Sequence, residues 1–201
     1  MDHQIYFSAF SQAEDSIYSR FQKKRELFFA PLCKSLTKMG VKPDYLSYFS
    51  LMMIIPFAYF LNNYAAVSFF ALLLSVLADA VDGCLARHQK ISSDQGALLD
   101  MAVDHAVLFS VVLTLIAFKI VDGFWGAAYA LNYFLMVVLV MTMRSLKMQV
   151  FLVLRSKYYL YLLVALWIFT GLNFLDIFVV FFAIYMLLTN LFLFHKLRWA
   201  L

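Results

Sequence analysis

The amino-acid sequence predicts an all-α integral membrane fold in which six transmembrane helices follow an amphipathic interfacial helix. Three observations predict this class. Of the 201 residues, 65% are hydrophobic and only 14% are charged, so the chain carries more apolar surface than one compact soluble domain buries. The apolar residues form runs long enough to cross a bilayer. The basic residues lie in the segments between these runs.

The segment before the first apolar run has the pattern of a helix in the membrane interface. Apolar residues recur at roughly helical spacing over residues 14–38, and basic residues lie between them. The apolar ones are Ile17, Phe21, Phe28 and Leu32, and the basic ones are Arg20, Lys23, Lys24 and Arg25. This alternation is typical of an interfacial amphipathic helix. Pro31 is expected to kink or divide it.

Apolar runs of about 20 residues, the length that crosses a bilayer as a helix, occupy most of the remaining chain. They cover residues 45–62, 66–82, 101–119, 124–143, 158–172 and 174–194. Gly171 and Asn173 separate the last two runs, which together are too long for one crossing. We therefore expect a cytosolic segment with the interfacial helix at residues 1–42 and a six-helix membrane domain at residues 43–201.

The basic residues predict the orientation, since lysines and arginines are retained on the cytosolic side during insertion. With the amino terminus inside and six spans, all 16 basic residues except Lys119 lie in cytosolic segments. Both termini are therefore expected in the cytosol. The net charge of +4 fits membrane lipid rather than nucleic acid as a partner, because the basic residues form no polar domain. The first 40 residues are too polar for a secretory signal peptide, so we expect them to be retained.

The cysteines and two of the histidines are interpreted as structural residues. Cys33 and Cys84 fall near the cytosolic face in this topology, where thiols stay reduced, so no disulfide is expected. Cys84 is interpreted as a small buried thiol rather than a nucleophile. His88 and His105 are interpreted as loop or packing residues rather than metal ligands.

Four aspartates stand within or at the ends of the second and third apolar runs, at Asp79, Asp82, Asp100 and Asp104. Carboxylates at membrane depth are rare and usually functional. The first two are three residues apart and the last two are four apart, so each pair shares one face of a helix. A short loop at residues 85–95 makes the two helices antiparallel neighbours, and we expect the acidic faces to converge near the cytosolic interface.

Four carboxylates in a partly desolvated site cannot all ionise unless cations compensate them. Two divalent cations balance four carboxylates, and oxygen-only ligation favours Mg²⁺ or Mn²⁺ over zinc. Paired cations suit phosphoryl transfer, because they hold phosphate oxygens and neutralise developing charge. A divalent-cation transporter is the alternative from another class. A transporter accounts for less of the sequence, because the acids lie at one interface rather than along a pathway across the membrane, and because Arg87 has no evident role in ion transport.

The aspartates belong to a longer pattern that reads Asp-x2-Asp-Gly-x2-Ala-Arg-x8-Gly-x3-Asp-x3-Asp. Its specified positions are Asp79, Asp82, Gly83, Ala86, Arg87, Gly96, Asp100 and Asp104. This pattern resembles the signature of the CDP-alcohol phosphotransferases (CDP-alcohol phosphatidyltransferases) at every specified position. The six-span layout and the interfacial helix also resemble that family. One departure is Asp44, at the entry to the first span, where many members have Asn.

The resemblance implies a transferase and a role for each signature residue. Asp79, Asp82 and Asp100 look like metal ligands, and Asp104 looks like the base for the acceptor hydroxyl and a contact to the second cation. The residues that look like CDP contacts are Asp82, Gly83, Ala86, Arg87 and Gly96. Glycines let a nucleotide approach a helix backbone closely, and a guanidinium pairs with phosphate oxygens. Relatives with this layout are often homodimers, which makes a homodimer the candidate assembly.

The acceptor alcohol is expected to carry its own phosphate. Arg144, Lys147, Arg155 and Lys157 cluster between the fourth and fifth runs, on the side of the aspartates, which suits such an acceptor. The positive-inside bias alone also accounts for them. We expect CDP-diacylglycerol as donor and glycerol 3-phosphate as acceptor, with CMP released, in a bacterial inner membrane. Inositol phosphate, serine or another alcohol remain alternative acceptors.

Overall fold

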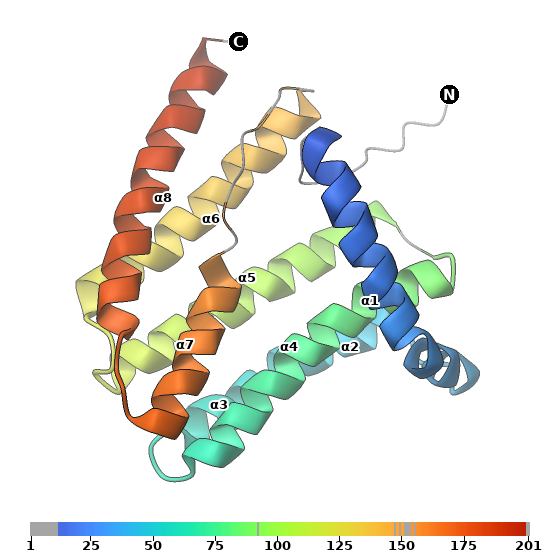
Figure 1. The fold of residues 1–201 in the computed structure, drawn as a ribbon, viewed down its shortest axis with the longest axis horizontal. Helices are drawn as coiled ribbons and strands as arrows, with labels where there is room; N and C mark the ends of the chain where they lie inside the picture. Colours follow the sequence, from blue (N-terminus) through green and yellow to red (C-terminus); the bar gives the residue numbers. More distant parts are fainter. Residues whose placement is uncertain are drawn as a thin grey trace. The chain divides into compact units, whose positions relative to one another are not determined.

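The computed structural model of the protein describes residues 12–91, 93–146, 148, 150, 154 and 156–199, apart from the side chains at positions 12–24, 94 and 144. Every regular element in these residues is an α-helix, so the predicted all-α class is confirmed. In chain order the helices are α1 (Gln12–Lys38), α2 (Pro43–Met52), α3 (Ile54–Phe60), α4 (Ala65–His88), α5 (Asp94–Ala117), α6 (Gly123–Ser145), α7 (Ser156–Thr170) and α8 (Leu175–Arg198) (Figure 1).

The chain forms two compact units. The first comprises Met1–Leu61 and Val67–Val107, and the second comprises Asn62–Ala66 and Leu108–Leu201. Helices α1, α2 and α3, almost all of α4 and the first part of α5 therefore belong to the first unit. All eight signature positions lie in this unit as well.

Helix α1 continues through Pro31 without a break. The expectation that this proline divides the helix is therefore wrong, and a kink remains the other expected effect. Figure 1 shows the helix bending toward its carboxyl-terminal end, where the proline ring removes one N–H donor from the helical ladder. One face of α1 packs on α4 through the buried Cys33. Leu27 and Phe28, by contrast, are 76% and 75% exposed.

The first predicted span, residues 45–62, consists of the two successive helices α2 and α3. Only Met53 separates them, and its backbone stays close to helical, with φ −67° and ψ −13°. Proline has no N–H to donate to the carbonyl four residues earlier, so Pro56 leaves the Met52 carbonyl without its helical partner. The next bond of the ladder, from the Phe57 N–H to the Met53 carbonyl, is present at 3.2 Å.

Buried hydroxyl groups join α2 and α3 to α4. Ser50 and Ser75 share a hydrogen bond of 3.0 Å, and the Ser68 hydroxyl donates to the Phe57 carbonyl at 2.7 Å. Small residues allow close approach of apolar helices, and hydroxyls supply the directional contacts that apolar packing lacks in lipid. The serines of α2 and α4 thus hold the segment that carries the signature.

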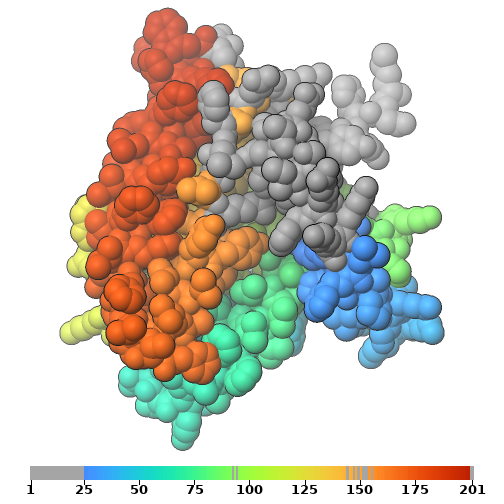
Figure 2. Space-filling view, viewed as in Figure 1, coloured from blue at the N-terminus to red at the C-terminus, as the bar shows by residue number. Residues whose placement is uncertain are grey.

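In the second unit, α6 packs along α8, and Figure 1 shows the two helices running in the same direction. The buried Asn190 amide on α8 donates to the backbone carbonyl of Asn132 at 3.0 Å and to its side-chain oxygen at 3.1 Å. At the start of α7, the Ser156 hydroxyl is 2.9 Å from the Tyr129 hydroxyl of α6. The side chains of α7 and α8 form one continuous surface in the space-filling view (Figure 2).

Four helices are long and apolar enough to cross a membrane, within the residues that the structure describes. They are Ala65–His88, Gln95–Ala117, Gly123–Met143 and Leu175–Arg198. Helix α7 has 15 residues, or about 22 Å, which is less than a typical hydrocarbon core of about 30 Å. The membrane-protein class is thus supported, but the count of six spans is not confirmed.

A glycine near the start of α6 permits close packing within the second unit. A Cβ at Gly126 would lie 2.7 Å from Cδ1 and 2.9 Å from Cγ1 of Ile116. Overpacking of this kind costs about 1–3 kcal/mol. We therefore expect Gly126→Ala to lower the melting temperature of the detergent-purified protein. Gly123→Ala is the matched control, because its Cβ would meet Ile116 at an ordinary 3.6 Å. A Gly126→Ala protein at least as stable as the control would contradict the packing described.

Candidate active site

The signature lies on two successive helices and not on a loop. Helix α4 extends to His88 and α5 begins at Asp94, so the connection covers only residues 89–93. The expected loop at 85–95 was therefore too long. Helix α4 continues because the side chains of Cys84 and Leu85 are buried, at 2% and 0% exposure, in a cluster with residues of α1. The signature residues of α4 thus stay on one rigid element.

The end of α4 is closed by backbone hydrogen bonds. The Ile91 N–H donates to the Ala86 carbonyl at 3.0 Å, and the Lys90 N–H donates to the Arg87 carbonyl at 3.1 Å. Lys90 itself adopts a left-handed conformation, with φ 56°. Together these form a Schellman motif, here without the usual glycine. The motif fixes the direction in which the chain turns toward α5.

The start of α5 is capped by Ser93. Its hydroxyl accepts a hydrogen bond from the Gly96 N–H at 3.1 Å, as expected of a serine just before the first helical turn. Among the described residues, a Cβ at Gly96 would meet only this hydroxyl, at 3.4 Å. The described residues therefore leave room for a ligand close to the backbone at Gly96.

Asp82 is the best-defined carboxylate of the signature. Its side chain is 4% exposed, and both of its oxygens accept hydrogen bonds, one from the Ser47 hydroxyl at 2.7 Å and one from the Gly83 N–H at 2.5 Å. A buried carboxylate needs such partners to offset the loss of hydration. Ser47 on α2 is thus a site residue to which sequence reasoning gave no role. Its only signal was a position at the entry to the first apolar run.

The aspartates of α5 lie close enough to Asp82 for their charges to act on it, Asp100 more strongly than Asp104. Asp79 lies one turn before Asp82 on α4 and is partly exposed, as are the two aspartates of α5. The expected convergence of the acidic faces is therefore supported for Asp82, Asp100 and Asp104. Like charges this close, partly removed from water, favour the binding of a cation.

The family signature implies divalent cations, and the donor chemistry fits them, because carboxylate oxygens are the ligands that Mg²⁺ and Mn²⁺ prefer. The positions of these side chains support a metal site less well than their chemistry does. Among the described residues, no group of three His, Cys, Asp or Glu side chains is placed so that it could hold a metal ion. Metal ligation by the aspartates therefore stays a prediction.

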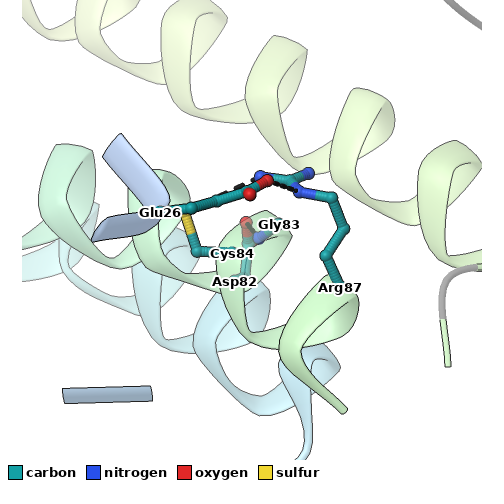
Figure 3. A network of polar contacts seen from close by, with 5 residues as sticks. All are labelled: Glu26, Asp82, Gly83, Cys84 and Arg87. Carbon is teal, nitrogen blue, oxygen red and sulfur yellow. Dashed lines mark hydrogen bonds and ion pairs between the residues drawn. The ribbon is translucent and has the colours of Figure 1, made fainter. Parts of the chain in front are cut away.

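Arg87 forms an ion pair with a residue of α1. Its Nε donates to Oε1 of Glu26 at 2.5 Å, and the side chains of Arg87 and Glu26 are 34% and 38% exposed. Figure 3 shows the two groups meeting beside Gly83 and the Asp82 carboxyl. Glu26 was missed by sequence reasoning, although it is an acid directly after the basic stretch of the predicted interfacial helix. Residues of α1 therefore belong to the surroundings of the signature.

A small cavity of about 130 Å³ adjoins this ion pair. It is lined by Glu26, Ala30, Cys33, Cys84, Arg87 and His88. Both cysteines are free thiols, as expected. Burial, reinforced by the neighbouring Cys84, raises the pKa of the Cys33 thiol, which keeps it protonated and unreactive.

The predicted acceptor-phosphate residues belong to the second unit and are only partly described. Lys147, Arg155 and the side chain of Arg144 lie outside the described residues. Lys157 is the second residue of α7, is 3% exposed, and has its Nζ 4.9 Å from the ring centroid of Tyr158. This is a cation–π contact. An acceptor site at these residues stays a prediction.

The long apolar helices and the buried aspartate between Ser47 and Gly83 define a helical protein of the membrane-spanning class with an acidic site. The family model for CDP-alcohol phosphatidyltransferases matches residues 41–201. The chain belongs to this family, which confirms the resemblance drawn from the signature. Membership supports transfer of a phosphatidyl group from a CDP-alcohol to an alcohol.

One relative is a protein of Aquifex aeolicus (strain VF5) described as uncharacterized. It is 34% identical to this chain over 86 residues, which is 42% of this chain and 44% of the relative. The matched region is thus less than half of either protein. Its description assigns no substrate, so the choice of donor and acceptor rests on the residues of this chain.

Proposed function

We propose that the protein transfers the phosphatidyl group of CDP-diacylglycerol to a polar alcohol and releases CMP. The observation that carries this proposal is the buried Asp82 carboxylate, held by Ser47 and Gly83 within reach of the charges of Asp100 and Asp104. A site that gathers negative charge at the end of apolar helices suits cation-assisted chemistry on a lipid phosphate.

The aspartates divide into ligands and a base in this proposal. Asp79, Asp82 and Asp100 would hold two divalent cations, Mg²⁺ or Mn²⁺, and Asp104 would add a contact to the second one. The cations, when bound, polarise the diphosphate oxygens and neutralise charge that develops on them. Asp104 takes the proton of the acceptor hydroxyl. The acceptor oxygen then bonds to the β-phosphorus, and the bond from that phosphorus to the bridging oxygen breaks, so CMP leaves.

The nucleotide lies over the α4 and α5 backbones in the same proposal, with contacts from Asp82, Gly83, Ala86, Arg87 and Gly96. Support comes from the open faces of the two glycines. A Cβ at Gly83 would meet only guanidinium nitrogens, the nearest being Arg87 Nη1 at 3.5 Å. A backbone without side chains, next to a cation, suits a diphosphate that must approach closely.

The proposed setting is a bacterial inner membrane with the active site and both termini in the cytosol. Residues 1–42 contain the interfacial helix and residues 43–201 form the catalytic membrane domain with six crossings, as a homodimer. The exposed Leu27 and Phe28 of α1 support an interfacial helix, because apolar side chains opposite the packed face can enter the bilayer surface.

Glycerol 3-phosphate is the proposed acceptor. Arg144, Lys147, Arg155 and Lys157 would bind its phosphate group, which a neutral acceptor such as serine lacks. Inositol phosphate would use the same residues, so these four do not distinguish the two phosphorylated alcohols.

The test is CMP release by the protein purified in detergent and mixed with CDP-diacylglycerol and Mg²⁺ or Mn²⁺. We expect CMP when glycerol 3-phosphate is added and little without an acceptor. Inositol phosphate and serine complete the panel and would identify the acceptor if glycerol 3-phosphate is inactive. No CMP with any acceptor, from protein that is folded and in lipid–detergent mixtures of several compositions, would refute the proposed reaction.

A further inference from the structure

Two guanidinium groups from different helices meet over Gly83. A Cβ placed on this glycine would lie 3.5 Å from Nη1 of Arg87 and 3.8 Å from Nη2 of Arg25. Arg87 follows Gly83 by one turn of α4, whereas Arg25 reaches this point from α1. Two cations directed at the same few ångströms of backbone repel each other, and the neighbouring Glu26 carboxylate is paired with Arg87.

The two arginines differ in how their donors are used. The Nε of Arg87 donates to Glu26. The Nε of Arg25 is buried and has no hydrogen-bond partner within the described part of the chain. A buried N–H without an acceptor is unfavourable, so the position of Arg25 favours a ligand that brings acceptor oxygens.

The chemistry of the missing acceptor follows from its surroundings. We expect an anion, because two guanidinium groups converge on this point, and a compact one, because the backbone there has no side chain at Gly83. A phosphate group meets both conditions, and a planar guanidinium matches its oxygens in a two-pronged contact. A diphosphate offers oxygens to both arginines at once.

We propose that Arg25 of α1 is a direct contact to the diphosphate of the CDP-alcohol, opposite Arg87 across Gly83. This inference rests on the proposed function, and it adds a residue outside the signature. Glu26 keeps the Arg87 guanidinium in place on the same side of the glycine (Figure 3). Helix α1 thereby becomes part of the nucleotide site.

The test compares CDP affinity of the purified full chain and its variants in Mg²⁺. We expect Arg25→Gln to weaken CDP binding by about tenfold or more, the usual effect of losing one hydrogen-bonded charge contact. Lys34→Gln is the matched control, since Lys34 is an exposed cation on the same helix. The CDP affinity of Lys34→Gln should stay within about twofold of wild type, because this variant loses the same charge from α1 at a residue that does not reach Gly83.

A third variant separates direct contact from a structural role. Arg25→Lys keeps the charge but loses the planar fork, so we expect it to recover part of the affinity. Wild-type CDP affinity in Arg25→Gln, or equal losses in Arg25→Gln and Lys34→Gln, would overturn the assignment of Arg25. Absence of CDP binding by the wild-type protein would instead refute the proposed function. The two failures are therefore distinguishable.

Discussion

The Asp104→Asn protein is expected to fold and to bind CDP, yet to release CMP from CDP-diacylglycerol about 10²–10⁴-fold more slowly than wild type. The substitution keeps the shape of the side chain and removes the carboxylate that is proposed to accept the proton of the acceptor alcohol. The proposed nucleotide contacts come from α1, α4 and the start of α5, which the substitution leaves in place. Turnover and CDP affinity, measured on the same preparation, separate these effects.

Asp44→Asn is the matched control for this variant. Asp44 is an exposed carboxylate in the first turn of α2, outside the signature. We expect turnover close to wild type for Asp44→Asn. If Asp104→Asn also retained wild-type turnover, Asp104 would not be the base.

Asp82→Asn is expected to abolish turnover for a different reason, the loss of cation binding. The buried carboxyl is a proposed cation ligand, and its two oxygens accept from Ser47 and from the Gly83 N–H. An amide has one acceptor oxygen, so one of these donors loses its partner at a cost of about 1–3 kcal/mol. We expect at least about tenfold weaker Mn²⁺ binding, a lower melting temperature and turnover reduced by at least about 10²-fold.

The measurement that distinguishes the two aspartates is a Mn²⁺ titration of activity and binding. Asp104→Asn should bind Mn²⁺ more like the wild type, because it keeps Asp79, Asp82 and Asp100, the three aspartates proposed chiefly as ligands. Asp82→Asn should need more Mn²⁺ for its residual activity. An unchanged Mn²⁺ dependence in Asp82→Asn would remove Asp82 from the set of ligands.

The helices of this protein were largely predictable because their causes are local. Long apolar runs fixed α4, α5, α6 and α8, and the signature residues fell on α4 and α5 as their spacing required. The division of the first apolar run into α2 and α3 also has a local cause, because Pro56 lies within this run and removes one helical hydrogen bond. The loop after α4 was placed wrongly because its Schellman turn uses Lys90, where the recognisable residue would be glycine.

The partners of the signature were not predictable from the sequence, because they come from distant parts of the chain. Ser47 precedes Asp82 by 35 positions, and Glu26 precedes Arg87 by 61. No periodicity connects residues so far apart, and a serine at the start of an apolar run or a glutamate in a basic helix has many ordinary explanations. Only the packing of α1 and α2 on α4 brings these side chains to the site.

The burial of the two cysteines gives the protein a reporter of its own. Cys33 on α1 and Cys84 on α4 are the only cysteines in the sequence, and each is 2% exposed where the two helices meet. Both cysteines line the small cavity beside the Glu26–Arg87 ion pair, so the rate at which a thiol-reactive label modifies the native chain reports access to that cavity. We expect a bound nucleotide to slow this labelling, and no cysteine has to be introduced to measure it.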